Sequence, residues 1–392
     1  MPKCLLIKNA DLYAPEHLGR QDILMIGEQV ALVAPEISGG VPGLETEVID
    51  AAGRKVIPGY VDQHVHIIGG GGESGPYSRT PEVQLSAVTT AGVTTVVGVL
   101  GTDGTTRHLE SLLAKARALD TEGITAYILT GSYEVPLNTI LSDARRDIIV
   151  IDKVLGIGEV SISDHRSSLP SRDEIKRIAS QARLGGMLSG KAGVLQFHMG
   201  SGKAGLTEVF AVLDETEIPA KHFIPTHVNR DEGLFRQAMD LARRGGYMDI
   251  TSGIRKKDGF SGGIEPSVAI RMCWEAGVPM DHVTMSSDGN GGMSLTLPDG
   301  SQKLLVAQLA SLHEEVRDAV LTEGVPLETA IRVAGENPAR ANGLWPRKGT
   351  IRPDSDGDLL ILDEEMHIDT VVARGRVMVR DGKAVVKGTY EP

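Results

Sequence analysis

Two histidines spaced two residues apart are the first feature of the sequence that could do chemistry. His64 and His66 follow an apolar run at 56–61, which is predicted to be a short buried strand entered through a Pro-Gly turn. Because alternate residues of a strand point to the same face, both imidazoles can reach one point, as two ligands of a metal ion do. A pair of packed core histidines is the other interpretation of so short a motif.

Three later apolar runs also end in side chains that bind metals. His198 closes the run at 194–197, His227 closes the run at 223–226, and Asp288 closes the run at 283–287. If these runs are parallel strands of a barrel, their carboxyl ends meet at one mouth, together with His64 and His66. Four histidines and one aspartate in this arrangement favour a metal site over packed histidines.

Glu159 is the one acidic residue in the apolar run at 154–162. Burying a carboxylate is expensive unless it is paired or bound to metal, so we predict that Glu159 lies between two metal ions. A salt bridge to Arg166 or to Arg230 is the alternative. Lys153 lies six residues earlier, about 20 Å away at strand rise, and cannot serve the same mouth.

The elements that must position these residues alternate strand with helix over residues 58–344. This rhythm predicts an α/β fold, a (β/α)8 TIM barrel, as the catalytic domain. A doubly wound open sheet would need a dinucleotide fingerprint. The run Gly200–Gly205 matches it, but the next strand ends in His227 and not in an acidic residue. The predicted strands end near His66, Gly101, Gly131, Ser163, His198, His227, Thr251 and Asp288, and the helical segments include 80–91, 108–119, 171–188 and 234–245.

Both ends of the chain have short β-rich runs separated by turns and no helix-length segment. Neither end can form a sheet core alone, so residues 1–57 and 345–392 are predicted to pair into one small β-sandwich domain. The predicted strands lie at 4–8, 22–26, 30–34, 47–49, 357–362, 370–373, 377–379 and 384–386.

The composition of the chain limits the kinds of molecule that it can bind. The 392 residues have a formal net charge of -12, which argues against nucleic acid or an anionic membrane as a partner. Two cysteines are too few for a disulfide framework or a thiolate zinc site. The first residues lack the apolar region of a signal peptide, and no apolar run reaches about 20 residues. These features predict a soluble cytoplasmic protein.

Together these motifs resemble the amidohydrolase superfamily, and the resemblance covers nearly the whole chain. Longer motifs are more discriminating and resemble the isoaspartyl dipeptidase family within it. They are the runs at 69–73, 129–133, 163–167 and 226–230, whereas the run at 287–290 belongs to the wider resemblance. The resemblance implies a metal-dependent hydrolase, a metalloprotease that cleaves the β-aspartyl peptide bond of isoaspartyl dipeptides and assembles as a homo-oligomer, an octamer.

The resemblance also implies roles for the metal ligands. His64, His66 and Asp288 would hold one Zn²⁺. His198 and His227 would hold a second, with Glu159 and a hydroxide bridging the two ions. Such ligands also accept manganese, iron, cobalt or nickel. Asp288 would move the proton from the hydroxide to the leaving amine, and Tyr133 would stabilise the oxyanion.

Charged residues at the same mouth predict the substrate. The guanidinium groups of Arg166 and Arg230 suit carboxylates, and Glu73 on a glycine loop suits a free ammonium group. A small zwitterion such as a dipeptide fits these groups, and Thr102 is a further predicted substrate contact. Arg166 could instead balance Asp164, and the glycine run could also serve as the hinge of a lid.

Two positions depart from the family pattern. Glu159 stands where the family carries a lysine carboxylated by carbon dioxide, and it offers the same two-oxygen anion. Gly292 stands where a serine touches the substrate, so that contact is lost or replaced. An amidohydrolase acting on another amide, such as a cyclic amide (dihydroorotase- or hydantoinase-like) or an N-acyl amino acid, is the alternative. Non-catalytic scaffolds of this superfamily lack several ligands, and this chain lacks none.

Overall fold

The computed structural model describes residues 4–260, 262–296 and 301–392. Its central element is an eight-stranded parallel sheet in which the strands follow chain order. The eight strands predicted from the sequence are confirmed, each ending within a few residues of its expected position. They are β6 (Tyr60–Val65), β7 (Val93–Gly98), β8 (Thr125–Thr130), β9 (Val154–Ile162), β10 (Val194–Met199), β11 (Phe223–Thr226), β12 (Met248–Thr251) and β13 (Val283–Ser286).

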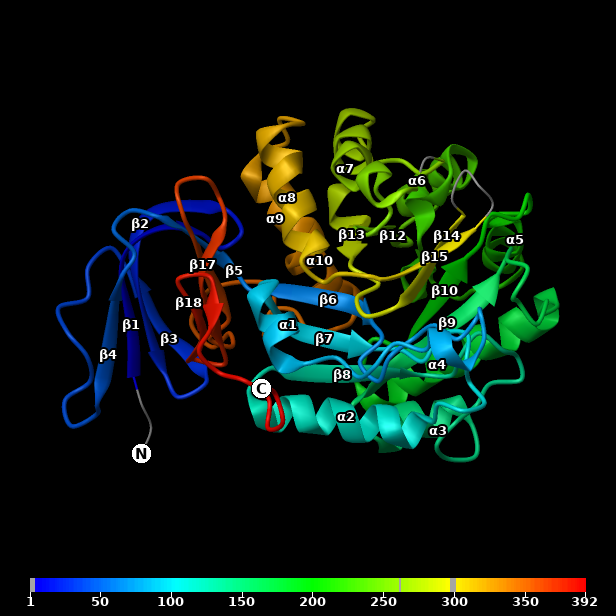
Figure 1. Ribbon diagram of the computed structural model, residues 1–392, viewed down its shortest axis with the longest axis horizontal. Helices are drawn as coiled ribbons and strands as arrows, with labels where there is room; N and C mark the ends of the chain where they lie inside the picture. The colour runs from blue at the N-terminus through cyan, green and yellow to red at the C-terminus, as the bar shows by residue number, and fades with distance from the viewer. Residues whose placement is uncertain (1–3, 261, 297–300) are drawn as a thin grey trace.

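The sheet curls into a barrel whose first and last strands meet at one seam (Figure 1). There Val65 and Gly289 form a parallel bridge, and the backbone N–H of His66 donates to the carbonyl of Gly289 at 2.9 Å. Residues that immediately follow β6 and β13 are therefore neighbours, although more than 200 residues separate them in sequence. This closure brings the two ends of the predicted metal site together.

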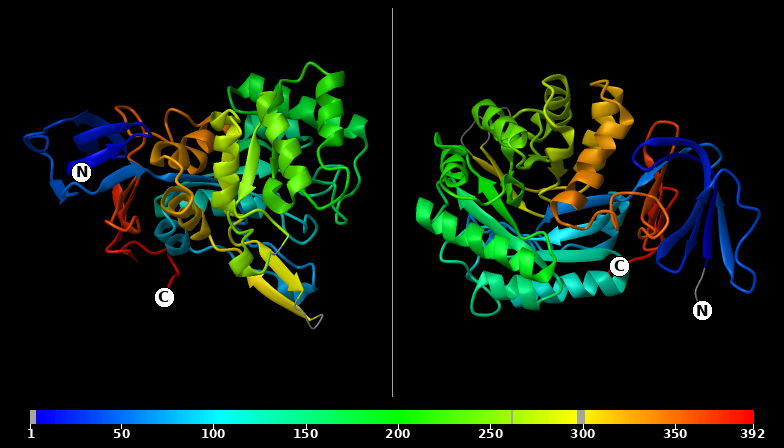
Figure 2. Two further views of the ribbon diagram at one scale, coloured as in Figure 1. Left: turned by 90° about the horizontal axis from the view of Figure 1, so that it is seen from above. Right: turned by 180° about the vertical axis from the view of Figure 1, so that it is seen from behind.

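A helix follows each barrel strand and covers its outer face (Figures 1 and 2). Helix α4 shows how the sequence sets the bounds: Ser171 and Glu174 form a capping box at its start, and Gly190 ends it in a left-handed conformation. The helices are α1 (Leu85–Thr90), α2 (Leu109–Glu122), α3 (Ala144–Val150), α4 (Arg172–Ser189), α5 (Thr207–Glu215), α6 (Glu232–Arg243), α7 (Pro266–Glu275), α8 (Ser311–Leu321), α9 (Leu327–Ala334) and α10 (Glu336–Ala341).

Helix α1 is shorter than the segment 80–91 predicted from the sequence. Residues 80–84 of that segment are not helical. The hydroxyl of Thr80 donates to the carbonyl of Asn290 at 2.7 Å and accepts from the N–H of Gly70 at 2.7 Å. These bonds hold the segment against the loops at the barrel mouth. The spacing of the apolar residues predicts a helix but cannot predict this tertiary contact.

The interior of the barrel is packed. Val97, Leu129, Leu155 and Ile224 belong to one apolar cluster inside the strands, and Ala341 at the end of α10 belongs to the same cluster. Helix α10 also contacts β6 and β13. Helix α10 therefore packs against the barrel strands, and the mouth lies at their carboxyl ends, where a TIM barrel carries its site.

Strands from both termini form one further sheet of nine strands, which confirms that the two ends of the chain build a common β domain. The N-terminal and C-terminal strands lie side by side next to the barrel (Figure 1) and share an apolar core that includes Leu12, Met25, Ile361 and Val372. The strands are β1 (Cys4–Tyr13), β2 (His17–Ile26), β3 (Gln29–Ala34), β4 (Thr46–Asp50), β5 (Lys55–Pro58), β16 (Leu359–Leu362), β17 (Ile368–Ala373), β18 (Arg376–Arg380) and β19 (Lys383–Ala384).

The run at 56–61, predicted to be one strand, is divided between the two sheets. β5 pairs with β16 in the terminal sheet, whereas β6 starts the barrel after a break at Gly59. A side chain at Gly59 would lie 2.5 Å from the hydroxyl of Thr94, so the crossing requires glycine. We retain 1–57 plus 345–392 and 58–344 as the proposed extents of the two domains. None of the described helices is long and apolar enough to cross a membrane.

His313 on α8 joins the barrel to the C-terminal segment and should make stability depend on pH. Its Nδ1 accepts from the hydroxyl of Tyr60 at 2.9 Å, and its Nε2–H donates to the carbonyl of Met366 at 2.8 Å. Burial lowers the pKa of His313 from 6.5 to about 4. Because the folded-state pKa is the lower one, stability is lost as pH falls from 6.5 to 4, by about 3 kcal/mol in total.

The variant His313→Gln keeps a donor and an acceptor but cannot titrate. We expect urea unfolding at pH 7 and at pH 4 to show a loss of stability that is smaller in the variant than in the wild type by about 3 kcal/mol. Equal losses of stability in the two proteins would mean that His313 is not the group whose protonation destabilises the fold.

Candidate metal centre and substrate cavity

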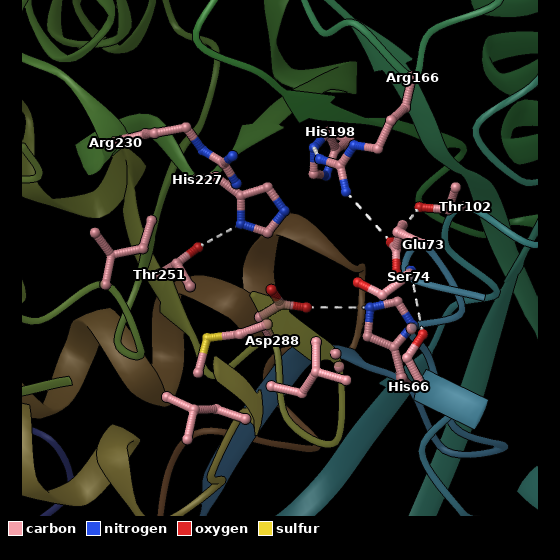
Figure 3. Close-up of a pocket in the computed structure, with 18 of the residues that line it drawn as sticks. His66, Glu73, Ser74, Thr102, Arg166, His198, His227, Arg230, Thr251 and Asp288 are labelled. Carbon is pink, nitrogen blue, oxygen red and sulfur yellow. Dashed lines mark hydrogen bonds and ion pairs between the residues drawn. The ribbon is translucent and has the colours of Figure 1, made fainter. Parts of the chain in front are cut away.

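A cavity of about 590 Å³ opens at the carboxyl ends of the barrel strands (Figure 3). Most of the residues that the sequence singled out line it: His66, Glu73, Thr102, Tyr133, Arg166, His198, His227, Arg230, Asp288 and Gly292. His64 and Glu159 lie deeper, at 0% and 1% exposure. The strand ends therefore bring all twelve predicted residues to one place, whereas Lys153, before β9, contacts Asp120 away from the mouth.

One group of ligand atoms joins β6 to the residue that follows β13. The Nε2 atoms of His66 and His64 lie 3.1 and 3.5 Å from Oδ1 of Asp288. Ligand atoms of the three residues all lie within 4.8 Å of one another. They form the set predicted for the first metal.

A second group surrounds Glu159. Its Oε1 lies 3.4 Å from Nε2 of His64, and its Oε2 lies 3.7 Å from Nε2 of His227 and 3.1 Å from Nδ1 of His198. Ligand atoms of His64, Glu159 and His227 again lie within 4.8 Å of one another. Glu159 thus has one oxygen facing the β6 histidines and the other facing the later two.

The donor set fits two divalent cations. In the described part of the chain, Nε2 of His64 and Oε1 of Glu159 are buried without a hydrogen-bond partner, although such atoms are normally paired. Burial opposes charge on His64, but Glu159 and Asp288 raise its pKa well above the usual value. The two carboxylates therefore favour positive charge at this point, and imidazole and carboxylate ligands suit zinc.

Two neutral side chains that the sequence reasoning missed orient the ligands. Oε1 of Gln196 lies 2.8 Å from Nδ1 of His64, and Oγ1 of Thr251 lies 2.7 Å from Nδ1 of His227. Each bond leaves Nε2 of its imidazole directed at the carboxylates, as in metal sites whose histidines are held by an outer partner. Gln196 had a signal in the sequence, because it is a polar residue in the apolar run of β10, two residues before His198.

Among the predicted ligands, His198 has the most crowded surroundings. Its Nδ1 also accepts from the hydroxyl of Tyr133 at 2.6 Å, and its Nε2 lies 3.2 Å from Oδ2 of Asp164. Arg166 hydrogen-bonds both carboxylate oxygens of Asp164 at 2.9 Å, so the predicted counter-charge contact is present. Asp164, which the sequence suggested only as a partner of Arg166, contacts both the histidine and the arginine.

Burial, reinforced by Glu159, raises the pKa of Tyr133 well above its usual value. The phenol therefore keeps its proton at neutral pH and can donate it in a hydrogen bond. Burial also lowers the pKa of His227 to about 3, which leaves a neutral imidazole with a free electron pair. Both states are those that a metal-dependent hydrolase site requires of an oxyanion donor and a ligand.

The rim of the cavity carries adjacent opposite charges. Oε1 of Glu73 accepts from the hydroxyl of Thr102 at 2.8 Å and lies 3.3 Å from Nη1 of Arg166. Arg230 stands apart, beyond His227 (Figure 3), and its Nε is buried without a partner among the described residues. Of the two arginines that line the cavity, Arg230 is the one with an unpaired N–H among the described residues.

Gly292 contributes backbone only, and the structure explains why. A Cβ at this position would lie 2.6 Å from Cα of Gly71, in the glycine run before Glu73. A serine would therefore force the two loops apart. Glycine replaces the family's serine at position 292 because the segments that follow β6 and β13 are in close contact there.

Comparison with known proteins agrees with this geometry. The profile of the amidohydrolase family matches residues 55–378. The chain is a member of the amidohydrolase family. Amidohydrolase relatives among curated proteins include the L-hydantoinase of Paenarthrobacter aurescens, which is 26% identical over 94% of this chain and 87% of its own length.

Two solved structures are more similar to this amidohydrolase. A β-aspartyl dipeptidase from Fervidobacterium islandicum AW-1, in complex with the β-Asp-Leu dipeptide, is 41% identical, with a TM-score of 0.89 over 97% of this chain and 98% of that chain. Another structure of the β-aspartyl dipeptidase from that organism is 42% identical, with a TM-score of 0.88 over the same shares. The structure of L-hydantoinase from Arthrobacter aurescens, at 18% identity, with a TM-score of 0.71 over 99% of this chain and 98% of that chain, shares the fold.

Proposed function

We propose that this amidohydrolase is a metal-dependent β-aspartyl dipeptidase that hydrolyses isoaspartyl dipeptides. The pair of Glu73 and Arg166, 3.3 Å apart at the rim, is the observation that carries the proposal. In a β-linked dipeptide the aspartyl residue keeps its α-ammonium and α-carboxylate on one carbon, and an adjacent anion and cation match them. The full-length similarity to the Fervidobacterium dipeptidase supports the same substrate.

The cofactor is proposed to be two Zn²⁺ per chain. His64, His66 and Asp288 would hold one ion, and His198 and His227 the other, with Glu159 between them. When bound, the ions supply a Lewis acid for the substrate carbonyl and an acidified water as the nucleophile. The same ligands accept manganese, iron, cobalt or nickel, so metal content has to be measured.

The remaining steps fall to the side chains of the chain. Glu73 and Arg166 hold the aspartyl residue, and Arg230 binds the carboxylate of the leaving residue. Asp288 takes a proton from the attacking water and delivers it to the leaving amine. Tyr133 donates to the oxyanion that develops on the scissile carbonyl. A homo-octamer and a cytoplasmic location stay predictions from the sequence.

Hydrolysis of β-Asp-Leu beside α-Asp-Leu, with metal content determined on the same preparation, tests the proposal. We expect turnover of the β-linked peptide only, with two metals per chain. Two metals without turnover of either peptide would overturn the dipeptidase assignment and direct the search to cyclic amides such as hydantoins, which relatives of lower identity process.

Tyr133→Phe is expected to lower kcat on β-Asp-Leu by about 10²–10³ while KM changes little, because the hydroxyl acts only when charge develops on the carbonyl oxygen. Steady-state kinetics at saturating metal measure this. Tyr127→Phe on β8 is a matched control whose ring lies outside the cavity. A Tyr133→Phe enzyme with wild-type kcat would assign the hydroxyl to holding His198 alone.

A further inference from the structure

The cavity has two walls of opposite chemistry. The charged groups Glu73 and Arg166 and the hydroxyl of Thr102 form one side, whereas apolar side chains gather on the side of Thr251 and Asp288 (Figure 3). We call the second side the apolar wall and define it by Ile254, Phe260, Met293, Leu304 and Leu305. The proposed catalytic groups account for the charged side and leave the apolar wall without a role.

Two supports build the apolar wall. Ile254 and Phe260 come from the loop after β12, and the others come from a hairpin after β13, formed by β14 (Gly292–Thr296) and β15 (Gln302–Val306). The hairpin extends away from the barrel body beside the mouth (Figure 2). At its base the N–H of Asn290 donates to the carbonyl of Ala307 at 2.8 Å, and the N–H of Ala307 donates to the carbonyl of Gly291 at 2.9 Å.

The loop is fixed as firmly as the hairpin. Arg255, 6% exposed, binds Asp258 at 2.5 Å and also pairs with Glu314 of α8. The N–H of Phe260 donates to the carbonyl of Arg255 at 3.1 Å. Leu295 of the hairpin approaches Gly259 so closely that a Cβ there would lie 2.6 Å from its Cδ1. The apolar wall is therefore preformed, which lowers the cost of binding a ligand.

The apolar wall is not fully covered by the protein itself. Leu304 is 40% exposed, and the wall faces the cavity beside Asp288. Apolar surface that a ligand removes from water contributes about 25 cal/mol per Å². A ligand with an apolar group on this side of the reacting carbonyl would gain that stabilisation.

Resting on the proposed function, we propose that the apolar wall binds the side chain of the residue after isoaspartate and selects dipeptides in which it is apolar. The charged side holds the aspartyl residue, so the leaving residue extends from the metal ligands toward Arg230 and the wall. Arg230 and the wall are adjacent, because a Cβ at Gly263 would lie 2.5 Å from Cγ2 of Ile254 and 3.9 Å from the carbonyl oxygen of Arg230, and both residues line the cavity. With its carboxylate on Arg230, the leaving residue turns its side chain to the wall.

Three substrates test this specificity: β-Asp-Leu, β-Asp-Asn and β-Asp-Gly. Asparagine has nearly the shape of leucine but carries a polar amide, so it separates apolar recognition from size. We expect kcat/KM for β-Asp-Leu to exceed both others by about 10-fold or more. Leu305→Ala should reduce the Leu-over-Asn ratio by about 3-fold or more, whereas Val306→Ala, on the same strand but outside the cavity, should leave the ratio unchanged.

Equal kcat/KM for the three substrates, or a Leu-over-Asn ratio that Leu305→Ala leaves unchanged, would overturn the specificity while the dipeptidase assignment stands. Absence of turnover of every β-linked peptide by the metal-loaded enzyme would overturn both together. Thermal unfolding of each variant confirms that it is folded, and Leu305→Ser serves as a second variant if Leu305→Ala does not fold.

Discussion

Replacing Glu159 by glutamine is expected to release bound metal and to lower kcat/KM on β-Asp-Leu by more than about 100-fold. Even partners one step removed from a metal ligand typically contribute 10–100-fold to affinity or activity, and Glu159 contacts both ligand groups. The amide has nearly the shape of the carboxylate but brings a neutral group to a position where His64 and His198 lie within 3.4 Å of its oxygens. Metal analysis after gel filtration measures the loss independently of activity.

Glu208→Gln makes the same chemical change on the exposed surface of α5, where Glu208 pairs with Arg172. This control should keep its metal and its rate, because exposed ion pairs contribute little. If Glu159→Gln also kept two metals and full activity, Glu159 would be no more than a hydrogen-bond partner of the histidines.

Asp288→Asn is expected to lower kcat by about 10²–10⁴, since an amide cannot accept the proton of the attacking water. The fold should tolerate the change. Asp288 has a φ of 55°, a left-handed conformation that asparagine adopts more readily than most residues. Single-turnover and steady-state rates on β-Asp-Leu, with metal content beside them, separate loss of the proton acceptor from loss of the ligand.

Asp231→Asn is a matched control. Asp231 caps α6 by accepting from the N–H of Leu234 at 2.9 Å, and asparagine caps a helix about as well as aspartate. The control should be active and as stable as the wild type. An Asp288→Asn enzyme with more than a tenth of the wild-type kcat would mean that another group moves the proton.

Strand ends are what the sequence revealed best. An apolar run that ends at a histidine or an acidic residue is a local pattern. Because the barrel brings the carboxyl ends of its strands to one mouth, the sequence could predict that His198, His227 and Asp288 lie together there. Contacts that cross strands were not visible. Nothing in the sequence pairs Gln196 with His64 or Thr251 with His227. The first pair joins β10 to β6, which are not neighbours in the sheet, and the second depends on the register of the neighbouring strands β11 and β12.

Local sequence patterns also failed to predict structure that depends on contacts between residues far apart in the chain. In the apolar run at 56–61 the Pro-Gly pair indicates a turn but not that the chain passes from one sheet to another at Gly59, where Thr94 approaches from the next strand. The hairpin that carries Met293 and Leu305 follows a glycine-rich loop and has too short an alternation to be predicted as paired strands. The apolar wall was therefore missed, although every charged group opposite it was found.

The small sheet formed by both termini sets the order in which a ribosome can complete this protein. Ile57 of β5 pairs with Leu360 of β16, about 300 residues later, so the nascent chain emerges with the edge of β5 open while the entire barrel is being synthesised. Strand β16, which is synthesised after the barrel, covers that edge and helps to complete the core around Ile361 and Val372. Translation that stops early therefore leaves an unpaired strand edge, the kind of surface on which chains aggregate.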